Sequence, residues 1–232
     1  MKISKLHLIA AMLPLAFGYQ LATAQTKVGI RAGVNFSSIT LKDEEGNKAE
    51  TQSTPGILLG LTADVPVMDG FFIQPGLLYS RKGYNQETGG YYDAASNFRV
   101  NVTYIELPVN VLYKPKFKSG NLVFGAGPYL AYGTGGKWKS DNVILIGDIM
   151  TDSKGNVIFR NDYKDGEFEN YLYGRPFDYG ANFLAGYEFM GRLSVQLNAQ
   201  IGLANLQPMF SGVKRNGAIK NKGFGLSVGY KF

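Results

Sequence analysis

Few side chains in this sequence have the chemistry that catalysis needs. Cysteine is absent, which excludes a thiol nucleophile, a disulfide framework and a zinc–thiolate cluster. The one histidine, His7, lies in an N-terminal segment that we expect to be removed. The mature chain therefore has neither a Ser-His pair nor an imidazole general base. No spacing indicates a Ser-Lys pair either, so we expect no enzymatic activity and no cofactor.

Two other stretches resemble ligand-binding motifs only superficially. The glycine-rich GTGGKW at residues 133–138 lacks the G-x-x-x-x-G-K-[ST] spacing of a phosphate loop and precedes no helical pattern. We interpret it as a flexible exit from a strand. Acidic residues of the following segment could bind Ca²⁺ weakly, but they do not follow an EF-hand spacing, and we favour a solvated loop. These residues are Asp141, Asp148, Asp152, Asp162 and Asp165.

Charged side chains at the polar positions of alternating apolar segments are more informative. If those segments are strands, every second residue lies on one face, and the charged residues share the face opposite the apolar ones. An unpaired buried charge is costly, so we expect ion pairs and hydrogen bonds among them. We favour a structural network that fills an interior over a proton or ion path. The residues are Arg31, Asp64, Lys82, Glu106, Glu188 and Lys231.

The elements that would position these charges are eight strands with period-2 alternation. Short turns at 66–70, 114–120 and 190–192 alternate with long connections at 37–54, 83–97, 133–176 and 204–222. This layout is typical of an outer-membrane barrel, so we predict an all-β fold: an eight-stranded antiparallel up-and-down transmembrane β-barrel. The predicted strands are residues 28–36, 56–66, 71–82, 103–113, 121–132, 177–189, 193–203 and 223–232.

One strand interrupts its own pattern. Apolar residues fall at odd positions from Ile105 onward but at even positions from Phe98 to Tyr104. We expect either a β-bulge near Tyr104 or a strand that leaves the membrane there.

The volume of the side chains decides which face of the barrel is outside. An eight-stranded barrel has an interior just wide enough for side chains to fill, and the apolar face carries many large residues. The opposite face is mostly Gly, Ser, Asn and Gln, and 30 of the 232 residues are glycine, about twice the usual share. The large apolar side chains must therefore face lipid. The outward aromatics gather at both strand ends, as the two interfacial girdles of such barrels do.

The N-terminal residues 1–24 have the order of a secretory signal peptide. A basic start with Lys2 and Lys5, an apolar run and Ala22-Thr23-Ala24 precede Gln25, and the run is too short to span a bilayer as a helix. We expect residues 25–232 to form one barrel domain with a long loop at 133–176 that contains a hairpin near residues 153–156. Removal of the signal leaves 22 basic and 18 acidic residues, too mild and dispersed a charge for a nucleic-acid partner.

Several segments in this order resemble the PorT-like outer-membrane β-barrel family. They are the first strand KVGIRAGVNFS, YIELPVNVLYK, GAGPYLAY, FDYGANFLAGYEF, QIGLANL and a terminal aromatic, spread over residues 27–232 apart from the long loops. The resemblance implies an eight-stranded barrel of OmpX and OmpA type, and we expect its amino terminus to lie in the periplasm. It also implies insertion by the barrel-assembly machinery, which would read Phe232 as an assembly signal. Some members are linked to type IX secretion, and most have no assigned task.

From these features we expect a monomeric, non-enzymatic protein of the Gram-negative outer membrane. Its long loops would serve an envelope structural, adhesion or secretion-accessory role with an unknown extracellular or secretion-system partner. A small transport or ligand-binding barrel is the alternative, and a soluble lipocalin-like carrier is a third. Basic residues near the last loop could contact lipopolysaccharide phosphates or remain solvated. These residues are Lys214, Arg215, Lys220 and Lys222.

Overall fold

A computed structural model describes residues 26–89, 95–143, 145–146, 149–150, 152–163 and 170–232. The predicted signal peptide at 1–24 lies outside these residues. Within them, no helix is long and apolar enough to cross a membrane.

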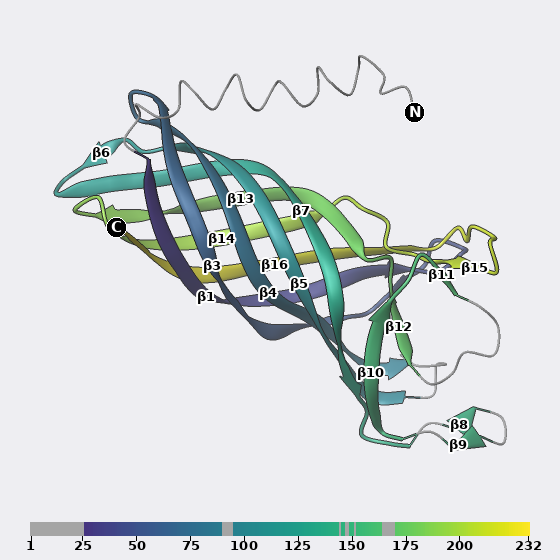
Figure 1. Cartoon of the computed structure of the whole chain (residues 1–232). Coiled ribbons are helices and arrows are strands. Elements are labelled where there is room, and N and C mark those ends of the chain that lie inside the picture. Colours follow the sequence, from purple (N-terminus) through teal and green to yellow (C-terminus); the bar gives the residue numbers. More distant parts are fainter. Residues whose placement is uncertain (1–25, 90–94, 144, 147–148, 151, 164–169) are drawn as a thin grey trace, which may run out of the picture.

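Eight long strands form one closed antiparallel ring, shown in Figure 1 as steeply tilted ribbons around a common axis. Each strand pairs with its neighbours in the chain, and β16 closes the ring by pairing with β1 over Gly29–Lys42. The structure thus confirms the predicted eight-stranded up-and-down barrel. The strands are β1 (Lys27–Lys42), β3 (Gln52–Met68), β4 (Phe71–Gly89), β5 (Ala95–Tyr113), β7 (Gly120–Lys139), β13 (Phe177–Phe189), β14 (Leu193–Gly202) and β16 (Ala218–Lys231).

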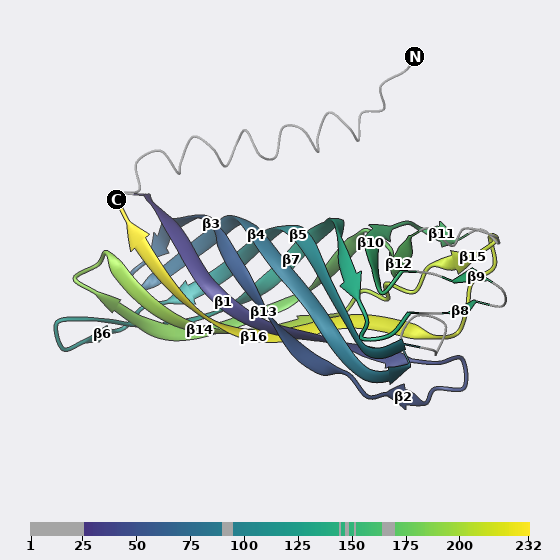
Figure 2. The same ribbon diagram turned by 90° about the horizontal axis from the view of Figure 1, so that it is seen from below.

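The two ends of the barrel differ. At one end, the short-turn end, tight connections join β3 to β4 and β13 to β14, and β1 begins beside the end of β16. Met190 and Gly191 take positive φ angles of 47° and 68° in the second of these turns, and a two-residue strand, β6 (Lys116–Phe117), pairs with β7. The opposite end, the long-loop end, carries all other small strands (Figure 2).

The outward face of the barrel is an apolar belt. Alternate residues of each strand leave large hydrophobic side chains about half exposed, for example Leu59, Leu107 and Val228 at 55%, 50% and 48%. Aromatic rings border the belt at both strand ends: Phe71 contacts Tyr113 at the short-turn end with ring centroids 4.8 Å apart. At the long-loop end Phe36 stacks on Phe224 at 5.4 Å. The large side chains therefore face outward, as their volume predicts.

The strands extend further at the long-loop end than the alternation predicts. β5 keeps a single alternation, so Phe98, Val100 and Val102 point inward with Glu106, while polar residues such as Arg99 replace the outward apolar ones. The strand leaves the apolar belt at this level. A register shift does occur opposite Thr103 and Tyr104, but the extra residue is Thr134 of the partner strand β7. The bulge therefore occurs at the predicted level, beside Tyr104, but on the neighbouring strand β7 and not on β5.

The bulge lets β7 contribute to an apolar core that lies inside the strand ends beyond the belt. After Thr134 the inward positions of β7 change parity, which points Trp138 into the interior against Phe98, with ring centroids 5.5 Å apart. Val100, Val102 and Leu206 have no exposed surface in this core. The apolar residues upstream of Tyr104 are therefore core residues of an extension that stands above the belt.

The long loop builds part of the wall of this extension. β10 (Lys154–Phe159) pairs antiparallel with the end of β7, and β12 (Tyr171–Gly174) pairs parallel with β10. The predicted hairpin, with its turn at residues 153–156, is therefore wrong: β10 begins at Lys154 and pairs with β7 instead of with an earlier segment of the loop. In the sequence between β7 and β10, the small strands β8 (Leu145–Ile146) and β9 (Ile149–Met150) pair with each other. Two more small pairs are β2 (Lys48–Ala49) with β1 and β11 (Asp162–Tyr163) with β15 (Met209–Phe210).

Candidate functional site

Four charged side chains meet in the lumen near the short-turn end. The ammonium groups of Lys114 and Lys231 each contact the same two carboxylates, Oδ2 of Asp64 and Oε2 of Glu188. The Lys114–Glu188 distance is 2.8 Å, and Gln74 donates a hydrogen bond of 2.8 Å to the other oxygen of Asp64. All four charged side chains are buried. This quartet ties together β3, β13, β16 and the residue after β5.

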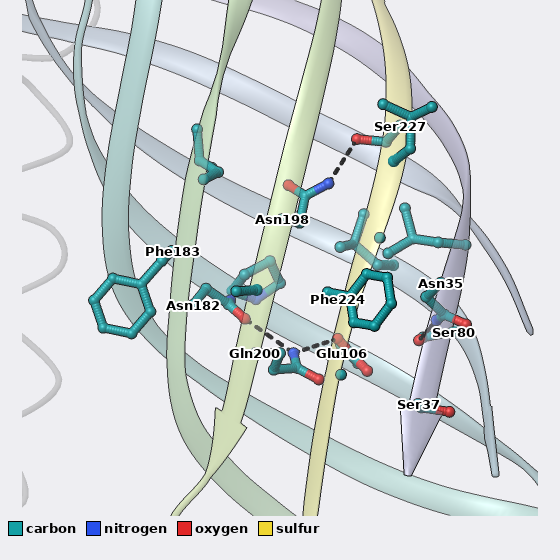
Figure 3. Close-up of a pocket in the computed structure, with 18 of the residues that line it drawn as sticks. Asn35, Ser37, Ser80, Glu106, Asn182, Phe183, Asn198, Gln200, Phe224 and Ser227 are labelled. Carbon is teal, nitrogen blue, oxygen red and sulfur yellow. Dashed lines mark hydrogen bonds between the residues drawn. The ribbon is translucent and has the colours of Figure 1, made fainter. Parts of the chain in front are cut away.

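A second charged cluster lies further along the lumen toward the long-loop end. Lys82 contacts Glu106 at 2.8 Å and Asp178 at 3.9 Å, and it also donates a hydrogen bond to Gln200. Gln200 donates in turn to Glu106 at 3.1 Å and to Asn182 at 2.9 Å, the two dashed lines at the lower centre of Figure 3. The network therefore spans the interior from β4 and β5 to β13 and β14.

Arg31 is held by neutral partners. Its guanidinium donates to Ser227 Oγ at 2.9 Å and to Asn198 Oδ1, and Asn198 donates to Ser227, the third dashed line of Figure 3. Of the six charges predicted to share the lumen, the structure brings Asp64, Glu188 and Lys231 together, and separately Lys82 and Glu106. Arg31 makes no ion pair with a described residue and is placed beside amide and hydroxyl groups instead.

Two lumenal charges escape the sequence analysis. Asp178 follows the outward Phe177 and accepts hydrogen bonds from Tyr129 at 3.0 Å and Asn221 at 2.9 Å. Lys114 follows the outward Tyr113 by one residue, so its inward position is the next step of the β5 alternation. Strict parity would have found both. With them, the buried charges of the described residues are four basic and four acidic side chains, a neutral set.

Little empty space remains around these groups. The cavity bounded by Arg31, Lys82, Glu106 and Asn198 measures about 70 Å³. A cavity of this size, lined by charged and amide groups, can hold water.

Above the charges, tyrosines close the interior. Tyr173 donates a hydrogen bond of 2.7 Å to Asn221, and the hydroxyls of Tyr84 and Tyr171 lie 2.7 Å apart. Burial raises the pKa of all three hydroxyls above the ordinary tyrosine value, so they stay neutral in the extension.

The outer face of the extension carries a row of cations that only the strand register reveals. Arg99 of β5 and Lys154 of β10 both pair with Lys139 of β7, so three outward cations stand on adjacent strands, about 5 Å apart. Lys137 lies two residues from Lys139 on the same outward face, and all four are exposed. We call Arg99, Lys137, Lys139 and Lys154 the basic row. Ion pairs between described residues lie in the lumen and between Arg215 and Glu44, not in this row.

The four basic residues predicted to contact lipopolysaccharide do not form one patch. Lys214 and Arg215 are exposed in the loop before β16, where the Arg215 guanidinium lies 4.6 Å from the Phe210 ring centre and 3.5 Å from Glu44. Lys220 and Lys222 lie on β16 itself, on the outward face that continues to Phe224. The predicted assembly signal, Phe232, is 73% exposed beside Tyr230, and its backbone N–H bonds to Val28 at 2.9 Å.

Metal ligands are sparse in the part of the chain that the structure describes. No group of three or more His, Cys, Asp or Glu side chains there could hold a metal ion. Of the five loop aspartates considered for Ca²⁺, Asp148 and Asp165 lie outside the described residues. The Asp162 carboxylate instead accepts a hydrogen bond of 3.1 Å from the Gly212 backbone N–H.

Comparison with known proteins assigns the family. The model of a family described as outer membrane protein beta-barrel domain matches residues 19–207. The chain belongs to this outer-membrane β-barrel family. It is therefore a protein of the Gram-negative outer membrane, and the apolar belt is its lipid-facing surface, which excludes the soluble lipocalin-like alternative. No curated protein matches the chain in sequence.

Solved outer-membrane proteins resemble it at low identity. OprG from Pseudomonas aeruginosa is 12% identical with a TM-score of 0.46, covering 90% of this chain and 97% of its own. Ail, the attachment invasion locus protein of Yersinia pestis, crystallised with the heparin analogue sucrose octasulfate, is 11% identical with a TM-score of 0.41, covering 89% and 99%. Neisserial surface protein A is 11% identical with a TM-score of 0.40, covering 89% and 97%. These values are too low to transfer a function to this chain.

Proposed function

We propose that this barrel is a closed, non-enzymatic outer-membrane protein whose working surface is the extension at its long-loop end, and that the surface adheres to an anionic polymer outside the cell. The observation that carries the proposal is the basic row. Like charges directly opposite each other on neighbouring strands are destabilising, so a sheet that aligns Arg99, Lys139 and Lys154 in one register suits an anionic partner.

The height of the basic row argues for a partner beyond the lipid headgroups. Lys139 lies seven residues past the belt residue Tyr132 on β7, or roughly 23 Å along the strand at about 3.3 Å per residue. With a strand tilt of about 40° this is a height of roughly 17 Å. A headgroup layer is only about 5–8 Å thick. The basic row therefore stands beyond the depth of a phospholipid headgroup layer.

Binding to a sulfated polymer tests this role. We expect the purified barrel to bind immobilised dextran sulfate in a salt-dependent way and not to bind neutral dextran. The variant Arg99→Gln/Lys139→Gln/Lys154→Gln should bind about tenfold more weakly or worse, since each exposed ion pair contributes up to ~1 kcal/mol. The charge-matched control Lys42→Gln/Lys116→Gln/Lys118→Gln should bind as the wild type does. Equal loss in both variants, or no binding by the wild type, would contradict the adhesive role.

The role requires that the long-loop end faces the outside and both chain ends face the periplasm. This orientation is supported by the layout of the family, in which short turns are periplasmic. Because the chain has no cysteine, single substitutions can report it. A membrane-impermeant maleimide should label Val213→Cys on intact cells and should label Met190→Cys only after lysis; both positions are well exposed, at 66% and 86%. The reverse labelling would contradict the orientation.

We also propose that the chain belongs with the PorT-like members of the family, supported by the order of the segments from KVGIRAGVNFS to QIGLANL. A secretion-accessory role would follow from that assignment. Unchanged export of type IX cargo in a strain that lacks this protein would rule it out.

A further inference from the structure

A cleft at the long-loop rim of the lipid belt combines cations with lipid-facing aromatic rings. It measures about 380 Å³ and is lined by Arg175, Lys214 and Arg215 together with Phe177 and Tyr179. The two rings belong to the outward face of β13 and are 57% and 54% exposed. The cleft therefore opens where the hydrocarbon of the membrane gives way to its headgroups.

The backbone fixes Arg175 firmly in this cleft. Its N–H donates to the Leu206 carbonyl at 2.8 Å, just before β13 enters the belt. The neighbouring N–H groups of Leu203 and Ala204 both donate to the Tyr179 carbonyl, at 2.9 and 3.1 Å. These bonds hold the segment after β14 against the start of β13 and place the guanidinium beside the loop that carries Lys214.

Arg175 also has unused hydrogen-bonding capacity. Among the residues that the structure describes, its buried Nε has no hydrogen-bond partner, and the side chain makes no ion pair. A buried donor without an acceptor is costly, and a planar guanidinium matches the oxygens of a phosphate or carboxylate. Arg215 is only loosely engaged, 3.5 Å from Glu44 with both side chains about half exposed.

From this arrangement we propose that the cleft binds the anionic phosphate of a lipid headgroup in the outer leaflet. Arg175 would supply bidentate hydrogen bonds, Lys214 a second positive charge, and the rings of Phe177 and Tyr179 contact with the first part of the acyl chains. The site is separate from the basic row, which stands well above the headgroups, and the adhesive role does not depend on it. It includes two of the predicted lipopolysaccharide contacts, Lys214 and Arg215, but not Lys220 or Lys222.

Lipid titration followed by native mass spectrometry tests the site. The full chain in detergent should retain phosphatidic acid in preference to phosphatidylcholine. Arg175→Gln should weaken that retention about tenfold, the equivalent of one charge-assisted hydrogen bond. Arg175→Lys should lose less, because it keeps the charge without the planar fork. Lys220→Gln/Lys222→Gln, which removes two nearby charges outside the cleft, should retain lipid as the wild type does.

Three outcomes would overturn the proposal. Arg175→Gln and the Lys220→Gln/Lys222→Gln control could behave alike, which would make the effect one of general charge. Inorganic phosphate at millimolar concentration could displace the lipid completely, which would make this a free-anion site. Phosphatidylcholine could bind equally well. If Arg175→Gln lowers the amount of heat-modifiable barrel, Lys214→Gln provides the same test without touching the residue next to β13, and its unchanged lipid retention would count against the site.

Discussion

Side chains buried in the lumen balance each other in charge. The quartet of Asp64, Lys114, Glu188 and Lys231 pairs every charge twice, so each ion that leaves water finds two opposite charges. Replacing a buried ion pair as a whole can be neutral, but removal of one partner leaves an uncompensated charge. The quartet therefore acts as one unit, and a single substitution in it should lower the free energy of unfolding strongly.

Removal of one lysine from the quartet should destabilise the barrel strongly. Lys231→Met leaves Asp64 and Glu188 with only Lys114, and we expect a loss of about 3–5 kcal/mol in the free energy of unfolding. The measurement is urea unfolding in detergent micelles, followed by heat-modifiable migration. Lys231→Met/Glu188→Gln, which restores the charge balance, should be more stable than the sum of the two single variants predicts. Strict additivity would show that the four residues do not act together.

At the scale of elements, the sequence predicts the membrane-spanning part of every strand and misses the extensions that some strands make beyond it. Alternation identifies β13 to the residue, because one face of it meets lipid and the other a lumen. Beyond the belt the two faces exchange polarity, as in β5 from Phe98 to Tyr104, and a pattern search ends there. The basic row is invisible for a related reason. Lys139 and Lys154 become neighbours only because the loop returns as β10.

The bulge at Thr134 should decide the side on which the end of β7 points. Deletion of Thr134 would exchange inward and outward positions after it, which places Trp138 outside and Lys139 in the apolar core. Trp138 is the only tryptophan of the chain and is 5% exposed, so its fluorescence reports the change directly. We expect a red-shifted, acrylamide-accessible emission from the deletion variant and wild-type emission from Thr134→Ala. An unshifted spectrum in the deletion variant would mean that the bulge does not set the facing of β7.

As a whole, the molecule is a closed barrel whose interior is occupied at two levels. Within the membrane it holds a neutral set of buried charges, and in the extension above it holds an apolar core. The wall continues past the membrane through the paired strands β4, β5, β7 and β10. The long-loop end is therefore a surface made of paired strands. The sequence predicted the outer-membrane barrel, while the paired charges and the built extension needed strand register that no single segment encodes. Eight strands leave an interior that side chains can fill, and here they do.

Conductance across a planar lipid bilayer tests this account most directly, because the central claim is that the filled lumen passes no ions and the barrel acts through its outer surface. The purified wild-type barrel should show no stable conductance at any voltage that the bilayer tolerates. Lys231→Met, which opens the quartet, should show at most brief and rare openings, since the tyrosines above it remain in place. A large, stable conductance from the wild-type protein would contradict the account and favour the transport alternative.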